Sequence, residues 1–338
     1  MTHELKDLIE KAYAWKKNEV KTVLATVVKL EGSSYRRPGV RMLINEKGGL
    51  HGAVSGGCVE KEVVRQAQSV FASGTPKIIS YDGRFRLGCE GILYILIEPI
   101  SISDTIYNSL LQNFKSRKPF QASVIYQLDN WEDPAMGTII ELQNANFSLH
   151  PSVNKETPKQ LEVFTQSFLP LFQLYLFGAE HDAVQLCKMA SQLGWQVHII
   201  APPDEQKTID YFEGAASLST PLFSDVDTSF IDANTAVMLM SHSFNKDLQY
   251  LFALKDTTPC YFGLLGPKHR REKLFDEFLN TYPDTPSAFF EHLHGPAGID
   301  IGAESAPEIA VSIIAEILCV MRNVAPKSLR EKVGKIHE

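Results

Sequence analysis

The stretch Leu171-Phe-Gln-Leu-Tyr-Leu-Phe177, followed by Gly178-Ala-Glu-His-Asp-Ala183, decides the fold of the second half of the chain. A run of mostly apolar residues is typical of a buried strand, and the glycine permits a tight turn. Apolar residues then recur at helical spacing as far as Leu193. After Gly194 a second apolar segment runs from Gln196 to Ile200. The pattern predicts two parallel strands joined by a helix.

The same alternation continues toward the C-terminus. Strands are expected at 235–240 and 260–264, with helices at 244–254, from Pro267 onward and, as the last element, at 306–322. Strands that alternate with helices form a parallel sheet covered on both faces. The fold class is therefore α/β, with a Rossmann-like, doubly wound parallel sheet domain expected over residues 165–325.

The first half of the chain has a different pattern. Helices are expected at 3–18, 58–72 and 104–116, and strands at 23–30, 41–45, 50–54, 77–81, 92–99, 120–127 and 137–143. Mixed order of this kind predicts an α+β domain over residues 1–155. Residues 150–159 carry two prolines and no periodicity, so we expect the linker there.

Charge and apolar content exclude several classes of protein. The 338 residues include 40 acidic and 33 basic side chains, a formal charge of −7, which argues against nucleic acid or an anionic membrane as partner. The longest apolar runs are interrupted and fall short of the ~20 residues that cross a bilayer. The N-terminus lacks the features of a signal peptide, and five widely spaced cysteines suit a reducing compartment, so a cytoplasmic location is expected.

Basic residues and thiols are concentrated in one part of this acidic chain. Arg36, Arg37 and Arg41 precede Ser55-Gly56-Gly57-Cys58, where the glycines expose backbone N–H groups at an expected helix start. The helix dipole and nearby guanidinium groups favour the thiolate form of Cys58. A second thiol, Cys89, lies between Gly88 and Glu90. The alternative is structural: Ser55 caps the helix, Cys58 packs in the core and the arginines are solvated.

These segments resemble the XdhC/CoxI family, the xanthine dehydrogenase accessory proteins. The resemblance rests on Gly32-Ser-Ser, Arg36-Arg-Pro-Gly39, Arg41, Ser55-Gly-Gly-Cys-Val-Glu60, Gly88-Cys89, Tyr261-Phe-Gly-Leu-Leu-Gly266 with Arg270 and Arg271, His294-Gly-Pro-Ala-Gly-Ile-Asp-Ile-Gly-Ala303, and Pro307-Glu-Ile-Ala310. It covers most of the chain outside residues 100–170.

The resemblance implies a carrier rather than a catalyst. Such a protein binds molybdenum cofactor, supports its sulfuration with a cysteine desulfurase, and inserts it into a xanthine dehydrogenase-like molybdenum hydroxylase. Arg36, Arg37 and Arg41 are assigned to phosphate or pterin oxygens, Ser55, Gly56 and Gly57 to the same binding loop, and Cys58 to the metal or sulfur side. Cys89 is a further candidate cofactor-binding residue. A homodimer is possible for a protein of this size.

The turn after the first strand of the Rossmann-like domain departs from nucleotide-binding sequences. Glu180 stands at the middle glycine of Gly-x-Gly-x-x-Gly, and Ala201 stands where an acidic ribose ligand is expected. Both features argue against NAD(P). Gly178, His181 and His242 remain candidate cofactor-binding residues, with polar helix-start or surface roles as the alternative. The rival function is an NAD(P)-dependent oxidoreductase, and a third possibility is a relative that has lost its ligand.

Overall fold

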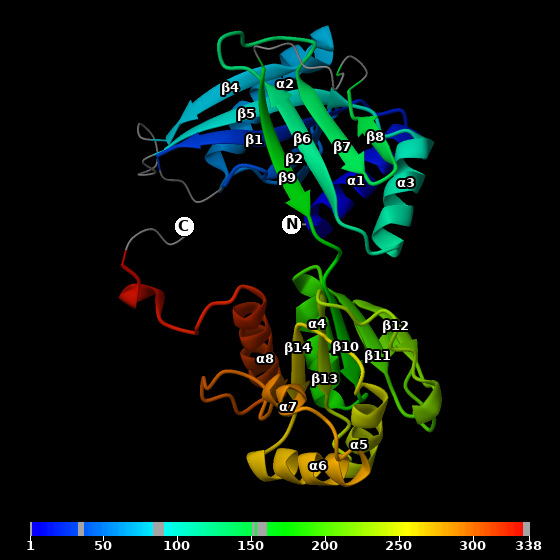
Figure 1. The fold of residues 1–338 in the computed structure, drawn as a ribbon. Coiled ribbons are helices and arrows are strands. Elements are labelled where there is room, and N and C mark those ends of the chain that lie inside the picture. Colours follow the sequence, from blue (N-terminus) through cyan, green and yellow to red (C-terminus); the bar gives the residue numbers. More distant parts are fainter. Residues whose placement is uncertain (1, 33–36, 84–90, 151–152, 154–160, 334–338) are drawn as a thin grey trace. The chain divides into compact units, whose positions relative to one another are not determined.

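The computed structural model describes residues 2–32, 37–83, 91–150, 153 and 161–333 (Figure 1). The chain divides into two compact units, residues 1–170 and residues 171–338. Each unit has its own buried core, and each is described by itself.

The N-terminal unit is α+β, as expected from the sequence. Its described elements are α1 (Thr2–Lys17), β1 (Thr22–Glu31), β2 (Arg41–Asn45), β3 (Leu50–Gly52), α2 (Cys58–Ser73), β4 (Lys77–Asp82), β5 (Ile92–Ile100), α3 (Asp104–Lys115), β6 (Phe120–Tyr126), β7 (Gly137–Leu142), β8 (Ala145–Ser148) and β9 (Glu162–Phe168).

Two antiparallel sheets form this unit. The first has the strand order β3-β2-β1-β5-β4 and the second β8-β7-β6-β9. Apolar residues of α2, such as Val59 and Val63, pack on one face of the first sheet. On the other face Val28 and Leu96 meet Val124 of the second sheet. The first sheet is therefore covered on both sides, and helix α1 also packs on β2, all five residues of which are buried.

The linker region differs from the sequence expectation. Strand β9 pairs antiparallel with β6 from Glu162 to Phe168, so the N-terminal unit extends to Pro170 rather than ending near residue 155. The short strand β8 was also not expected. Five of the seven residues of β9 are at least partly exposed and polar residues interrupt it, so the sequence shows little hydrophobic signal there.

The C-terminal unit confirms the Rossmann-like prediction. Its strands follow the order β12-β11-β10-β13-β14-β15, and every pairing is parallel. The elements are β10 (Gln173–Phe177), α4 (His181–Gln192), β11 (Gln196–Ile200), β12 (Ala215–Ser219), β13 (Thr235–Leu239), α5 (Phe244–Ala253), β14 (Tyr261–Leu264), α6 (Lys268–Thr281), α7 (Ser287–Glu291), β15 (Leu293–His294) and α8 (Ala306–Met321).

Helices cover both faces of the parallel sheet (Figure 1). One apolar cluster joins the sheet to α4 and α8 and includes Leu186 and Ile313. The opposite cluster joins it to α5 and α6 and includes Leu251 and Phe278. Strand order reverses direction between β10 and β13, the position where open α/β sheets bind ligands. Among the described residues no helix is long and apolar enough to span a membrane.

Candidate functional site

The carboxyl ends of β10 and β13 lie very close together at the point where strand order reverses. Gly178, directly after β10, has φ 133°. A Cβ atom built at this glycine would lie 2.6 Å from the carbonyl oxygen of Met240, directly after β13. Only glycine allows this approach at this backbone angle. Gly178 therefore permits the close approach of the two strand ends, in keeping with the tight turn expected from the sequence.

His242, in the turn after β13, contacts the start of helix α4. Its Nε2 lies 2.9 Å from Oδ2 of Asp182, and about half of the His242 side chain is exposed. His242 adopts a left-handed φ of 55°, which is uncommon for a residue other than glycine. His181, beside Asp182, is exposed at the start of α4. The structure therefore brings Gly178, His181 and His242 to one edge of the sheet, and it adds Asp182, which was not among the candidate residues.

A buried ion pair supports the turn that carries His242. The carboxylate of Asp247 is 1% exposed and accepts a 2.7 Å hydrogen bond from Nη2 of Arg270. It also accepts hydrogen bonds from the backbone N–H (3.1 Å) and hydroxyl (2.5 Å) of Ser241. Asp247 thereby links α5, α6 and the end of β13. The sequence interpretation did not single out Asp247, although an acid in the first turn of the helix expected at 244–254 was a visible signal.

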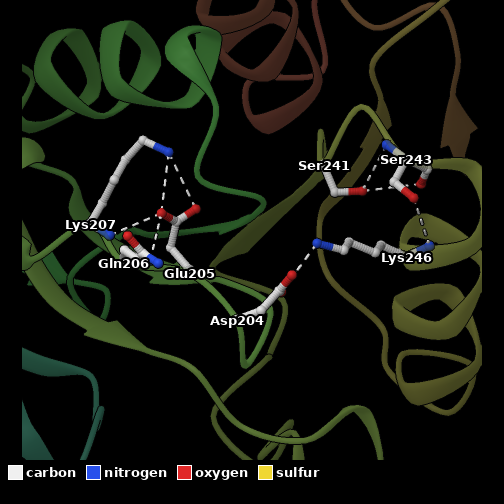
Figure 2. A network of polar contacts seen from close by, with 7 residues as sticks. All are labelled: Asp204, Glu205, Gln206, Lys207, Ser241, Ser243 and Lys246. Carbon is white, nitrogen blue, oxygen red and sulfur yellow. Dashed lines mark hydrogen bonds and ion pairs between the residues drawn. The ribbon is translucent and has the colours of Figure 1, made fainter.

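A second ion pair connects the loop after β11 with α5. Figure 2 shows the Nζ of Lys246 directed at Asp204, with a separation of 3.2 Å. Asp204 is the acid nearest the position of a ribose ligand, and Ala201 precedes it. Glu180 is the exposed N-cap residue of α4. A dinucleotide would therefore meet Glu180 at the pyrophosphate position and would compete with Lys246 for Asp204.

The Ser55–Cys58 segment starts helix α2, as expected. Gly57 is the N-cap residue with φ 124°, and Cys58 is the first helical residue. The Glu60 carboxylate accepts hydrogen bonds from the backbone N–H groups of Ser55 (2.6 Å) and Gly57 (2.7 Å). Glu60 therefore already accepts from two of the backbone N–H groups that the sequence analysis considered for binding an anion. A Cβ atom built at Gly56 would have no heavy atom within 4 Å.

Arg41 lies inside the N-terminal unit rather than on an exposed loop. It is 6% exposed, and its Nη1 donates to the Gly39 carbonyl oxygen (2.8 Å) and to Oε1 of Gln166 (2.5 Å). Burial lowers the pKa of Arg41 to about 10, an effect that the charge of Glu98 opposes. Arg37, by contrast, is exposed. The two arginines therefore have different environments, which the clustering in sequence did not indicate.

The candidate residues fall into two groups, one in each unit. The N-terminal group consists of Arg37, Arg41, Ser55, Gly56, Gly57 and Cys58, and the C-terminal group of Gly178, His181 and His242. Arg36 and Cys89 lie outside the described residues. Among the residues that the structure does describe, no cluster of three or more His, Cys, Asp or Glu side chains is arranged to hold a metal ion.

Comparison with known proteins matches both units to one family. The model of the XdhC Rossmann domain matches residues 174–317, and the model of the XdhC and CoxI family matches residues 15–82. The chain belongs to the XdhC/CoxI family. The resemblance seen in the sequence motifs is thereby confirmed, with a match in each half of the chain.

Two relatives of this family member are similar over most of their length. One, from Bacillus subtilis (strain 168), is named as a probable subunit of xanthine dehydrogenase, and it is 29% identical over 91% of this chain and 96% of its own. The molybdenum cofactor insertion chaperone PaoD of Escherichia coli (strain K12) is 26% identical over 88% of this chain and 83% of its own.

One solved structure shares the fold. The crystal structure of a xanthine dehydrogenase from Bacillus halodurans superimposes with a TM-score of 0.76 over 98% of both chains, at 24% sequence identity.

Proposed function

We propose that this protein binds molybdenum cofactor, protects it, and inserts it into a xanthine dehydrogenase-type molybdenum hydroxylase. The observation that carries the proposal is the similarity to PaoD, a molybdenum cofactor insertion chaperone, across 88% of the chain. Family membership of both units supports it. In this proposal the cofactor is cargo, and the protein acts as a carrier more than a catalyst.

The chemistry of the cargo suits the candidate residues. Molybdenum cofactor carries a phosphate, a polar pterin and a dithiolene-bound metal, so it requires guanidinium and N–H donors together with protection from water. We assign the phosphate and pterin oxygens to arginines and the metal or sulfur side to cysteine. The proposed binding residues are Arg36, Arg37, Arg41, Ser55, Gly56, Gly57, Cys58, Cys89, Gly178, His181 and His242.

Two partners follow from this role. A cysteine desulfurase supplies the sulfur for the terminal sulfido ligand while the protein holds the cofactor, and the client hydroxylase then receives it. We further propose a cytoplasmic location, where both partners meet the carrier, and assembly as a homodimer.

Anaerobic purification tests the proposal. The full-length protein is isolated from cells that synthesise molybdenum cofactor and from cells that do not, and molybdenum and pterin are quantified per polypeptide. We expect both components in comparable amounts in the first preparation and neither in the second. If a known carrier is loaded under the same conditions and this protein contains neither component, the proposal is wrong.

The strand order of the C-terminal unit favours one rival, an NAD(P)-dependent oxidoreductase. Glu180 at the pyrophosphate position and the Asp204–Lys246 ion pair disfavour it. Calorimetric titration with NADH and NADPH separates the two functions. We expect no saturable heat in the micromolar range, whereas micromolar binding would support the oxidoreductase.

A further inference from the structure

Helix α8, which covers one face of the parallel sheet together with α4 (Figure 1), is apolar on two opposite sides. Its inner side packs in the core that it shares with the sheet and α4. Its outer side consists of Val311, Ala315, Leu318 and Cys319, which follow one another at helical spacing. Val311 is 48% exposed, and the other three are partly exposed. A helix that is apolar on all sides is normally buried on all sides, so we expect a partner to cover the outer side of α8.

The charged residues of this outer side stand at its two ends. Glu308 lies in the first turn of α8 and Arg322 directly after its last residue, and both are exposed. Ala315 stands midway between them, about two helical turns from each, so all three lie on the same side. The other charged residue of α8, Glu316, accepts a 2.6 Å hydrogen bond from the hydroxyl of Tyr261 within the same unit. The outer side is therefore an apolar stripe that is acidic at one end and basic at the other.

The segments that flank α8 have the same distribution of charge. Exposed Asp300 and Glu304 precede the helix, and exposed Lys327 and Arg330 follow it. Both segments also expose large apolar side chains, namely Ile301 before the helix and Val324 and Leu329 after it. Residues 300–330 therefore form a surface whose first half is complementary in charge to its second half. A surface of this kind matches a second copy of itself in the opposite direction.

We propose that the outer side of α8 is the interface of a homodimer, in which the two α8 helices lie antiparallel across a two-fold axis at Ala315. Glu308 then pairs with Arg322 of the partner subunit at each end, and Val311 faces Cys319 of the partner subunit. The small side chain of Ala315 allows the two helix axes to approach to about 8 Å. A parallel arrangement would instead bring the two Glu308 carboxylates together. The inference rests on the homodimer of the proposed function and not on the cargo.

The flanking segments enlarge this interface. A standard interface buries ~800 Å² on each partner, and the side of one helix supplies only part of such an area. In the antiparallel arrangement the acidic segment before each α8 lies beside the basic segment after the other. Their exposed apolar side chains then extend the apolar stripe beyond both ends of the helix pair.

Sedimentation velocity of the full-length protein over a range of concentrations tests the interface. We expect a mass of about twice the 37.8 kDa of one chain. Ala315→Arg should raise the dimer dissociation constant about a hundredfold, because it places two guanidinium groups together at the two-fold axis. Arg322→Glu should raise it about tenfold, because both ion pairs become pairs of like charge. Lys273→Glu, the same type of charge reversal at an exposed position of α6, should leave the constant unchanged.

Disulfide cross-linking tests the symmetry. A residue on a two-fold axis meets its own copy, so diamide should join two chains of Ala315→Cys within the short Cα separation that a disulfide requires. We expect a covalent dimer on a non-reducing gel. Lys273→Cys, at the exposed position of α6, should give no more covalent dimer than the wild type. Equal cross-linking of the two variants would contradict the proposed axis.

The outcomes separate this inference from the proposed function. A monomer at every concentration, a mass that grows beyond two chains, or a dimer insensitive to both Ala315→Arg and Arg322→Glu would overturn the interface. Arg322→Glu changes an exposed residue beyond the last helical turn, so it decides the matter even if Ala315→Arg fails to fold. A monomer that carries the cofactor would support the function and overturn the interface. A dimer that responds to these variants but contains no cofactor would support the interface and contradict the function.

Discussion

Nε2 of His242 lies 2.9 Å from Oδ2 of Asp182, which connects the turn after β13 with the first turn of α4. The two residues lie where the order of the parallel strands reverses. His242 has a left-handed backbone conformation. The turn that contains it is stabilised by hydrogen bonds from the N–H and hydroxyl groups of Ser241 to the buried carboxylate of Asp247. Residues kept in sparsely populated conformations are concentrated at functional sites.

Replacement of His242 by asparagine tests whether its imidazole contributes to cargo binding. Asparagine tolerates the left-handed conformation, so His242→Asn should change the free energy of unfolding by no more than about 0.5 kcal/mol. Retention of cofactor after anaerobic gel filtration should fall severalfold. The matched control is His269→Asn, an exposed histidine on α6. Equal retention of cofactor in both variants would show that the His242 side chain has only a structural role.

Gly178 is expected to be the least replaceable residue at this edge. In Gly178→Ala the new methyl group would lie 2.6 Å from the carbonyl oxygen of Met240, at a φ that alanine avoids. The free energy of unfolding should fall by about 3 kcal/mol, measured by urea denaturation with a probe in the C-terminal unit. Gly56→Ala, where nothing lies within 4 Å, should cost less than about 1 kcal/mol. A stable Gly178→Ala protein would show that the two strand ends can separate.

Because of Glu98, we expect the stability of the N-terminal unit to depend on pH. Burial raises the pKa of this carboxyl to about 7, although the backbone N–H and hydroxyl of Thr138 donate to it. Between the unfolded pKa near 4.5 and the folded value, the folded state binds one proton more than the unfolded state. Stability is therefore greatest below about pH 4.5 with respect to this group, and falls as pH rises through 7.

Urea unfolding at several pH values between 5 and 8 measures this dependence. The wild-type protein should lose roughly 3 kcal/mol from Glu98 over this range, and Glu98→Gln should remove most of that slope. Glu10→Gln, an exposed carboxylate paired with Lys6, should leave the slope as in the wild type. A wild-type slope that persists in Glu98→Gln would assign the titration to another group.

Cys58 is the thiol proposed for the metal or sulfur side of the cargo. Cys58→Ala should lower the molybdenum content of the anaerobically purified protein severalfold with little effect on unfolding, because alanine suits the start of a helix. Cys260→Ala is the control, since burial raises the pKa of that thiol to about 11 and keeps it protonated. Unchanged molybdenum content in Cys58→Ala would favour the structural alternative.

Most elements of the fold were predictable because their apolar residues have clear periods. The unit from Leu171 to Ile200 combines a buried strand, a glycine turn and an amphipathic helix, and the structure has all three. Strand β12 was missed because Ala215–Ser219 is small, polar and partly exposed. Strand β15 is only two residues long, so no period can reveal it. Both strands lie at the edges of the sheet, where they pair with a neighbouring strand. Such pairing depends on tertiary contacts, which the local sequence pattern does not contain.

The environment of the site residues was less predictable than the fold. Arg41 follows a loop of basic residues, and its sequence context suggests an exposed cation. It is buried beside α1, which packs on β2, and beside β9, whose Gln166 contacts it from 125 positions away in sequence. The pairs His242–Asp182 and Asp247–Arg270 likewise join residues from separate elements. Spacing within one segment contains no signal for such contacts.

Transfer of cargo tests the central claim most directly. Protein purified anaerobically from cofactor-producing cells is incubated with an apo molybdenum hydroxylase of the xanthine dehydrogenase type, and hydroxylase activity is compared with that produced by protein from cofactor-deficient cells. The account predicts that only the first preparation activates the hydroxylase, with molybdenum lost from this protein and gained by the client in equal amounts. Equal activation by both preparations, or none by either while a known insertion chaperone succeeds, would contradict it.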